Sequence, residues 1–92
     1  MNKSEAKIIL RDLAKYGKIA YSEHSIDQMI NRNITTEDIL YALMWGKIKS
    51  VEKNATHQNW KCKIIGKTVD EDELTILAAI YSETKTVIIT VF

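Results

Sequence analysis

The spacing of hydrophobic positions along the chain changes near Gly46. Before this residue, apolar positions recur every three or four residues, which is the period of an amphipathic helix. After it, apolar and polar residues tend to alternate, which is the period of a β-strand. The pattern predicts helices within residues 4–45 and an antiparallel sheet within residues 47–92. We therefore expect one α+β domain over residues 1–92, with N-terminal helices packed on one face of a four-stranded antiparallel sheet.

The first two predicted helices are recognised from their start and stop signals. Ser4 is the expected N-cap of the first helix, and Gly17 is its expected C-terminal stop. Ser22 is a good N-cap for the second helix because its hydroxyl can accept a hydrogen bond from a free amide of the first turn. At about 100° per residue, one face of this second helix carries three apolar side chains, those of Ile26, Met29 and Ile30.

A third helix is expected directly after the second. Asn33 tolerates the left-handed conformation that ends many helices. Thr35, followed by Glu37 and Asp38, resembles a capping box with acids in the first turn, and Gly46 is the expected end of the helix. We expect the helices to bury against the sheet the apolar side chains of Ile9, Leu13, Met29, Ile30, Ile39 and Leu43.

Four strands are predicted in the second half of the chain. Residues 47–53 are rich in lysine, as an edge strand protected from aggregation would be. Residues 60–64 alternate apolar residues with lysines, residues 74–81 are apolar on nearly both faces and should form the central strand, and residues 86–92 are β-branched. Short connections between these segments favour antiparallel hairpins. Residues 19–21 are interpreted as a short extended entry into the second helix.

Composition narrows the class of protein. Hydrophobic residues make up 46% and charged residues 27% of the chain, which is typical of a soluble globular domain and excludes intrinsic disorder. The N-terminus has no apolar segment of a signal peptide, and no apolar run approaches the length of a membrane span. One cysteine, Cys62, and two histidines do not make a zinc ligand set. We expect a cytoplasmic protein with no membrane association, metal or cofactor.

The net charge of +1 conceals an uneven distribution of charge. Residues 46–67 contain six lysines and one acid, which is a net charge of +5, and the four residues Asp70 to Glu73 are all acidic. A basic surface can therefore be masked in the total by a single acidic loop. The equally weighted alternative is that the lysines line a solvated strand pair and the acids line a turn.

The segment from Tyr21 onward resembles the DUF4258 family. The pattern consists of a serine–histidine pair, a methionine and an arginine in the second helix, a capped third helix, a glycine and a closing strand. Where the family usually has glycine after the arginine, this chain has Asn33, and both residues accept left-handed geometry. The residues that carry the likeness are Tyr21, Ser22, Glu23, His24, Met29, Arg32, Ile34, Thr35, Glu37, Asp38, Ile39, Gly46 and Val87 to Phe92.

This resemblance implies a fold like that of the RelE- and barnase-like ribonuclease toxins. Some relatives in that broad group cleave RNA without a metal, often as toxins held in check by an antitoxin protein. The resemblance therefore implies RNA as the substrate and an antitoxin as the partner. A shared fold does not by itself establish a reaction.

Metal-free RNA cleavage needs a base for the 2′-hydroxyl, an acid for the leaving oxygen and positive charge near the phosphate. His24 is the candidate base or acid because histidine exchanges protons near neutral pH. Arg32 is the candidate phosphate clamp, although eight residues place it about 12 Å along the helix from His24. Thr90, expected to share a face with Thr86, Ile88 and Phe92, is a candidate catalytic hydroxyl. The structural alternatives are a helix-start histidine bonded to a carbonyl, a helix-end cation and a buried, satisfied threonine.

Three further residues are candidates for RNA binding. Lys61 and Lys63 share one strand face and can hold the RNA backbone, and Tyr81 at the end of the central strand can stack a base or donate a proton. Solvated strand lysines and a packing tyrosine are the structural alternatives. Trp45 and Trp60 are interpreted as core or helix–sheet contacts.

Three functional hypotheses follow. A metal-free endoribonuclease of the toxin–antitoxin type requires His24, Arg32 and the lysine face to converge on one surface. A catalytically inactive RelE-like module that binds protein or nucleic acid requires only a basic surface. A structural domain would pair the edge at residues 47–53 with a strand of another chain.

Overall fold

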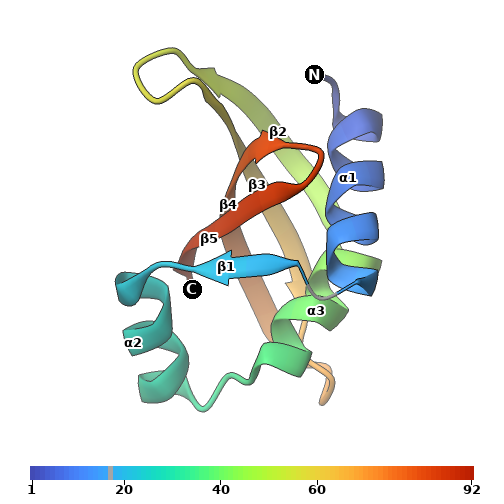
Figure 1. The fold of residues 1–92 in the computed structure, drawn as a ribbon. Helices are drawn as coiled ribbons and strands as arrows, with labels where there is room; N and C mark the ends of the chain where they lie inside the picture. The colour runs from blue at the N-terminus through green and yellow to red at the C-terminus, as the bar shows by residue number, and fades with distance from the viewer. Residues whose placement is uncertain (17) are drawn as a thin grey trace.

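The computed structural model describes residues 1–16 and 18–92, which form three helices and a five-stranded mixed sheet (Figure 1). The expected helix stop at Gly17 lies outside the described residues. No helix of the described part is long and apolar enough to cross a membrane. In chain order, the elements are α1 (Lys3–Lys15), β1 (Ile19–Tyr21), α2 (Glu23–Arg32), α3 (Thr36–Trp45), β2 (Lys47–Asn54), β3 (Asn59–Lys67), β4 (Glu73–Ser82) and β5 (Lys85–Val91).

The strands lie in the order β1-β5-β4-β3-β2. Strands β2 to β5 form an antiparallel meander with β4 between β3 and β5, which confirms the predicted central strand and the lysine-rich edge strand β2. The prediction of four antiparallel strands is wrong at the other edge, where β1 pairs in parallel with β5. Three residues carry too little alternation to be recognised as a strand, and their partner is the last strand of the chain.

Helices α1 and α3 cover one face of the sheet, while α2 lies apart from them beside the C-terminal end of β5 (Figure 1). The covered face supplies the core, because its side chains are removed from water by these helices. Fully buried members of this core come from α1, α3 and the three central strands: Leu10, Ile39, Leu43, Ile64, Leu74, Ile76, Ile80 and Ile88.

Helix boundaries follow local hydrogen bonding. Asn2, not Ser4, is the N-cap of α1, because Asn2 and Glu5 exchange side-chain to backbone bonds in a full capping box. The predicted caps of the other two helices are confirmed. Ser22 begins α2, Asn33 ends it in the left-handed conformation with φ of 54°, and Thr35 begins α3.

The prediction for the buried side of α2 is partly wrong. Met29 is buried as expected, but Ile30 is 69% exposed and Ile26 is 43% exposed. Ser25 is fully buried, and Gln28 hydrogen-bonds β5. The helix therefore packs against β5 through a mixed polar and apolar stripe and leaves its most apolar flank outside.

The second face of the sheet, here called the open face, is left uncovered by the described helices. Its side chains alternate along each strand with those of the core and are mostly exposed or half-buried. The open face is formed by Lys47, Ser50 and Glu52 of β2, Lys61, Lys63 and Ile65 of β3, Thr75, Leu77 and Ala79 of β4, and Val87, Thr90 and Phe92 at β5, with Tyr81 at its end, where the pairing of β4 and β5 is irregular.

Candidate nucleic-acid interface

The two predicted RNA-binding lysines lie in neighbouring rows of the open face. Lys63 is opposite Leu77, which in turn is opposite Thr90 on β5. Lys61 is opposite Ala79 in the next row. With about 4.8 Å between adjacent strands, the backbones at Lys63 and Thr90 are about 10 Å apart, a span that a lysine side chain can largely cover.

A β-bulge brings Thr90 to this face. Ala78 pairs with Ile88 and Leu77 pairs with Thr90, so Ile89 is an extra residue in β5. Thr86 and Ile88 therefore lie on the covered face and are buried, whereas Thr90 lies on the open face and is half-buried. The expectation that these three residues share a face is wrong, because strict alternation does not anticipate a bulge.

Two aromatic rings of the open face lie beneath lysines. The Lys85 ammonium lies 5.0 Å from the centre of the Tyr81 ring, and the Lys63 ammonium lies 5.7 Å from the centre of the Phe92 ring. Both rings are close to half exposed. Such a pair presents a flat apolar surface and a positive charge together, which suits a nucleotide. The expectation that Phe92 shares a face with Thr90 is confirmed, but the sequence did not identify Phe92 as a binding residue.

His24 is exposed in the first turn of α2, and this turn is fixed to the bulge of β5. The Ser22 amide donates to the Ile88 carbonyl, and the Ser22 hydroxyl donates to the Ile89 carbonyl, both at 2.9 Å. The same Ser22 oxygen accepts a hydrogen bond from the Ser25 amide. The helix turn that carries His24 and the bulge that positions Thr90 are thus held together.

The orientation of α2 places His24 toward the open face. The Gln28 side-chain oxygen accepts a hydrogen bond from the Val91 amide at 2.8 Å, and His24 precedes Gln28 by one turn. Ile26 is about 200° around the helix from His24 and lines a groove with Tyr21, whose strand partner Ile88 belongs to the covered face. His24 therefore lies on the flank of α2 away from that groove, which is the flank nearest the open face.

Arg32 is not brought together with the lysines. It lines a hollow at the C-terminal end of α2 whose other charged members are all carboxylates. A phosphate placed there would meet the negative field of these acids, which opposes the predicted role of Arg32 as a phosphate clamp. These carboxylates belong to Asp38, Asp70, Asp72 and Glu73.

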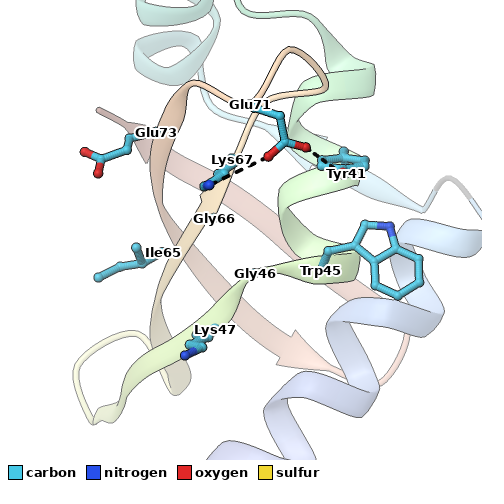
Figure 2. A pocket seen from close by; sticks show the side chains of 9 residues that line it. All are labelled: Tyr41, Trp45, Gly46, Lys47, Ile65, Gly66, Lys67, Glu71 and Glu73. Atoms are coloured by element: carbon cyan, nitrogen blue, oxygen red, sulfur yellow. Dashed lines mark hydrogen bonds and ion pairs between the residues drawn. The ribbon is translucent and has the colours of Figure 1, made fainter.

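A cavity of about 340 Å³ lies between the C-terminal end of α3 and the C-terminal end of β3 (Figure 2). Glu71 accepts a hydrogen bond from the Tyr41 hydroxyl at 3.4 Å and pairs with Lys67 at 3.7 Å, so the cavity's charges largely satisfy one another. Trp45 at its rim is 64% exposed and lies under the Arg11 guanidinium, so the expectation of a core contact is wrong for this residue. Trp60 packs against the core as expected.

Two other side chains, Cys62 and Tyr21, have pKa values that are shifted by burial. Burial raises the pKa of the Cys62 thiol to about 11, so this side chain is a neutral core residue rather than a nucleophile at neutral pH. Burial also raises the pKa of Tyr21. Neither group supplies proton transfer near pH 7.

The family relationship rests on residues that the structure places in α2, α3 and the sheet. No curated protein matches the chain, and no solved structure matches it. The sequence profile described as "Domain of unknown function (DUF4258)" matches residues 21–92, which contain the elements from α2 to β5 and the last residue of β1. The chain belongs to the DUF4258 family.

Proposed function

We propose that this domain is a metal-free endoribonuclease of the toxin–antitoxin type that holds single-stranded RNA across the open face. The observation that carries the proposal is the grouping of Lys61, Lys63 and Thr90 on that face, beside the helix turn that bears His24. Lysines contribute the phosphate affinity that single-stranded RNA binding needs. The half-exposed rings of Tyr81 and Phe92 supply stacking surfaces on the same face.

We also propose that the fold is of the RelE type. The antiparallel meander of β2 to β5, with helices on one face, supports this assignment. An antitoxin protein is the proposed partner, since toxins of this type are held inactive until they are needed. The likeness of the fold supports the functional proposal only as an analogy, and the proposal rests on the residues of the open face.

The proposed reaction is an internal transfer at phosphorus. The 2′-oxygen forms a new bond to the neighbouring phosphorus, the bond to the 5′-oxygen breaks, and a 2′,3′-cyclic phosphate remains. His24 removes the proton of the 2′-hydroxyl or delivers one to the departing 5′-oxygen, and solvent water takes the other of these two proton transfers. Lys63 and the Thr90 hydroxyl stabilise the added negative charge of the phosphorane. Because carboxylates surround Arg32, we do not include it in the proposed catalytic set.

A catalytically inactive RelE-like module that binds protein or nucleic acid is the second candidate. The observation that favours it is the separation of Arg32 from the lysine face, because the histidine–arginine pair expected from the sequence is not assembled. This candidate retains RNA binding on the open face but predicts no cleavage.

Cleavage of a fluorescent single-stranded RNA by the purified chain distinguishes the two. We expect His24→Ala to lower the cleavage rate by at least about 100-fold with little change in binding, because a neutral imidazole adds little phosphate affinity. The matched control is His57→Ala, which replaces the other histidine, also exposed, in the turn between β2 and β3. EDTA should leave the rate unchanged.

Replacing the lysines should have the opposite effect to replacing His24, because it should weaken RNA binding more than it slows cleavage. We expect Lys61→Ala/Lys63→Ala to weaken RNA binding and to reduce its salt dependence by about one charge per lysine. Lys3→Ala/Lys15→Ala on α1 is the control for a general loss of charge. RNA binding without cleavage would favour the inactive module, and no RNA binding by the wild-type chain would reject the ribonuclease and leave only a module that binds protein.

A further inference from the structure

A second surface lies on the other flank of α2. A groove of about 560 Å³ runs between this helix and the start of α3. Met29 and Ile34 are buried along it, and Tyr21 of β1 lies at one end. Ile26 and Ile30, which are 43% and 69% exposed, are one helical turn apart and form its outer wall.

The apolar side chains of this groove are continuous rather than scattered. Two exposed isoleucines on one helix flank, joined to a methionine and a third isoleucine beneath them, make a connected apolar surface. Connected apolar surface that remains in water is characteristic of interaction sites. Helix α2 is attached to β5 through the hydrogen bonds of Ser22 and Gln28 rather than through the flank that carries Ile26 and Ile30.

The rim of the groove is acidic. Glu23 precedes Ile26 by three residues and Asp27 precedes Ile30 by three, so both acids lie beside the isoleucines on the helix surface. Glu37, next to the groove residue Thr36, adds a third exposed carboxylate at the start of α3. The basic residue of α2, Arg32, lies in the hollow near the acidic turn instead.

The acidic residues beside the groove indicate which kind of molecule it can bind. A two-fold symmetric contact between two copies of the chain would place one acidic rim against the other, which is repulsive. A contact with the basic outer side of α1 of another copy would be head-to-tail and would not close into a dimer. The complementary occupant is a different chain that offers apolar anchors flanked by Lys or Arg.

We propose that this groove binds an amphipathic helical segment of another protein, with apolar residues at positions i, i+3 or i+4 and i+7 and basic residues beside them. The proposal does not depend on ribonuclease activity. The groove lies on the flank of α2 away from His24, so a segment bound there leaves the open face accessible. The partner and RNA would then bind at the same time.

The test uses a synthetic helical peptide with leucines at the anchor positions and lysines beside them, added to the whole domain in a calorimetric titration. A second peptide carries glutamates in place of the lysines. We expect the lysine peptide to bind at least about 10-fold more tightly than the glutamate peptide, since like charges oppose the acidic rim. Amide NMR shifts should identify residues 21–36 as the binding region.

Substitutions in the groove and at a control position test where the peptide binds. Ile26→Ala/Ile30→Ala should lower affinity for the lysine peptide by about 10-fold or more, whereas Ile8→Ala, which truncates an isoleucine of α1 that is 63% exposed, should not change it. Glu23→Gln/Asp27→Gln should reduce the preference for the lysine peptide.

Three outcomes would overturn the proposal: no binding of the lysine peptide, shifts centred on the acidic turn at Asp70 to Glu73, or equal binding by the isoleucine variant. The assay of RNA binding and cleavage, run on Ile26→Ala/Ile30→Ala, should match the wild type. The two proposals therefore fail independently.

Discussion

At the scale of single residues, Asp38 connects two parts of the fold. Its carboxylate accepts hydrogen bonds from the Thr35 amide at 2.9 Å and from the Val69 amide at 3.0 Å. Its own amide donates to the Thr35 hydroxyl at 3.1 Å, which completes the capping box of α3. The Thr35 backbone bond, together with the Val69 bond, lowers the pKa of the Asp38 carboxyl below its usual value. The ionised form therefore ties the start of α3 to the turn between β3 and β4.

We expect Asp38→Asn to reduce the free energy of unfolding at pH 7 by about 1–2 kcal/mol, the range for losing a capping acceptor or a charged hydrogen bond. A depressed folded-state pKa stabilises the protein above the unfolded value near 3.9, and this contribution is lost as the pH falls through the folded-state pKa. Urea unfolding at pH 7 and pH 3 should show the difference between wild type and variant narrowing in acid. Asp12→Asn, on the exposed side of α1, is the control, and a difference independent of pH would contradict the argument.

At the scale of elements, the attachment of α2 to β5 is the contact that relates His24 to the open face. Beyond the end of β1, the Val91 amide has no strand partner on that side and donates to Gln28 instead. Val91 is fully buried, so this amide cannot exchange Gln28 for water. Gln28 thus supplies an acceptor to β5 beyond the point where β1 and Ser22 end the backbone pairing.

We expect Gln28→Ala to destabilise the domain by about 1–3 kcal/mol, because it leaves a buried donor without an acceptor. Gln28→Glu keeps the acceptor oxygen and should retain most of the stability. Amide hydrogen exchange followed by NMR should show faster exchange at Val91 in the alanine variant than in the glutamate variant. Equal protection of Val91 in both variants would mean that Gln28 does not anchor α2.

Features that depend on neighbouring residues were predictable from the sequence. The caps Ser22, Asn33 and Thr35 follow from side chains that bond within one turn or tolerate left-handed geometry, and the structure has all three. The exception is α1, where the reciprocal bond of Glu5 makes Asn2 a better cap than Ser4. The central position of β4 was predictable because it is apolar on nearly both faces, although helices cover only one of these faces.

Features that depend on distant pairing were not predictable. The parallel partner of β1 is 67 residues further along the chain, and no local period announces it. The extra residue Ile89 in β5 moves Thr90 to the opposite face from the one that alternation predicts. Ile30 was expected in the core because its flank of α2 is the most apolar, but the helix is attached through Gln28 and Ser22. The candidate site therefore combines Lys61 and Lys63, which the alternation of the strand predicts, with Thr90, which the β-bulge at Ile89 places on the open face.

At the scale of the whole molecule, the charges are unevenly distributed, although Glu52 of β2 lies opposite Lys61 and Lys67 pairs with Glu71. Lys61 and Lys63 lie in the middle of β3 on the open face, while the acids from Asp70 to Glu73 lie in and beside the turn between β3 and β4, near Arg32. This arrangement agrees both with a basic surface masked by an acidic loop and with lysines on a solvated strand pair beside an acidic turn. A second acidic region, at Glu23 and Asp27, borders the groove on α2.

The whole fold also depends on a helix that the family match does not include. The match begins at residue 21, but α1 places Leu10 and three other side chains in the core, where they are removed from water by the sheet and α3. A domain of this size retains only about 5–15 kcal/mol of net stability. Loss of one fully buried leucine is therefore a large fraction of the total.

We expect Leu10→Ala to lower the free energy of unfolding by about 2–5 kcal/mol, the range for truncating a buried leucine. The matched control is Ile8→Ala, two residues away on the exposed side of the same helix, which should change stability by less than about 0.5 kcal/mol. Removing residues 1–18 should abolish cooperative unfolding, because the apolar side chains of α3, β2 and β5 that α1 covers would then meet water. Urea titration followed by circular dichroism measures all three. A truncated chain that unfolds in a sharp transition near the wild-type midpoint would show that residues matched by the family fold without α1.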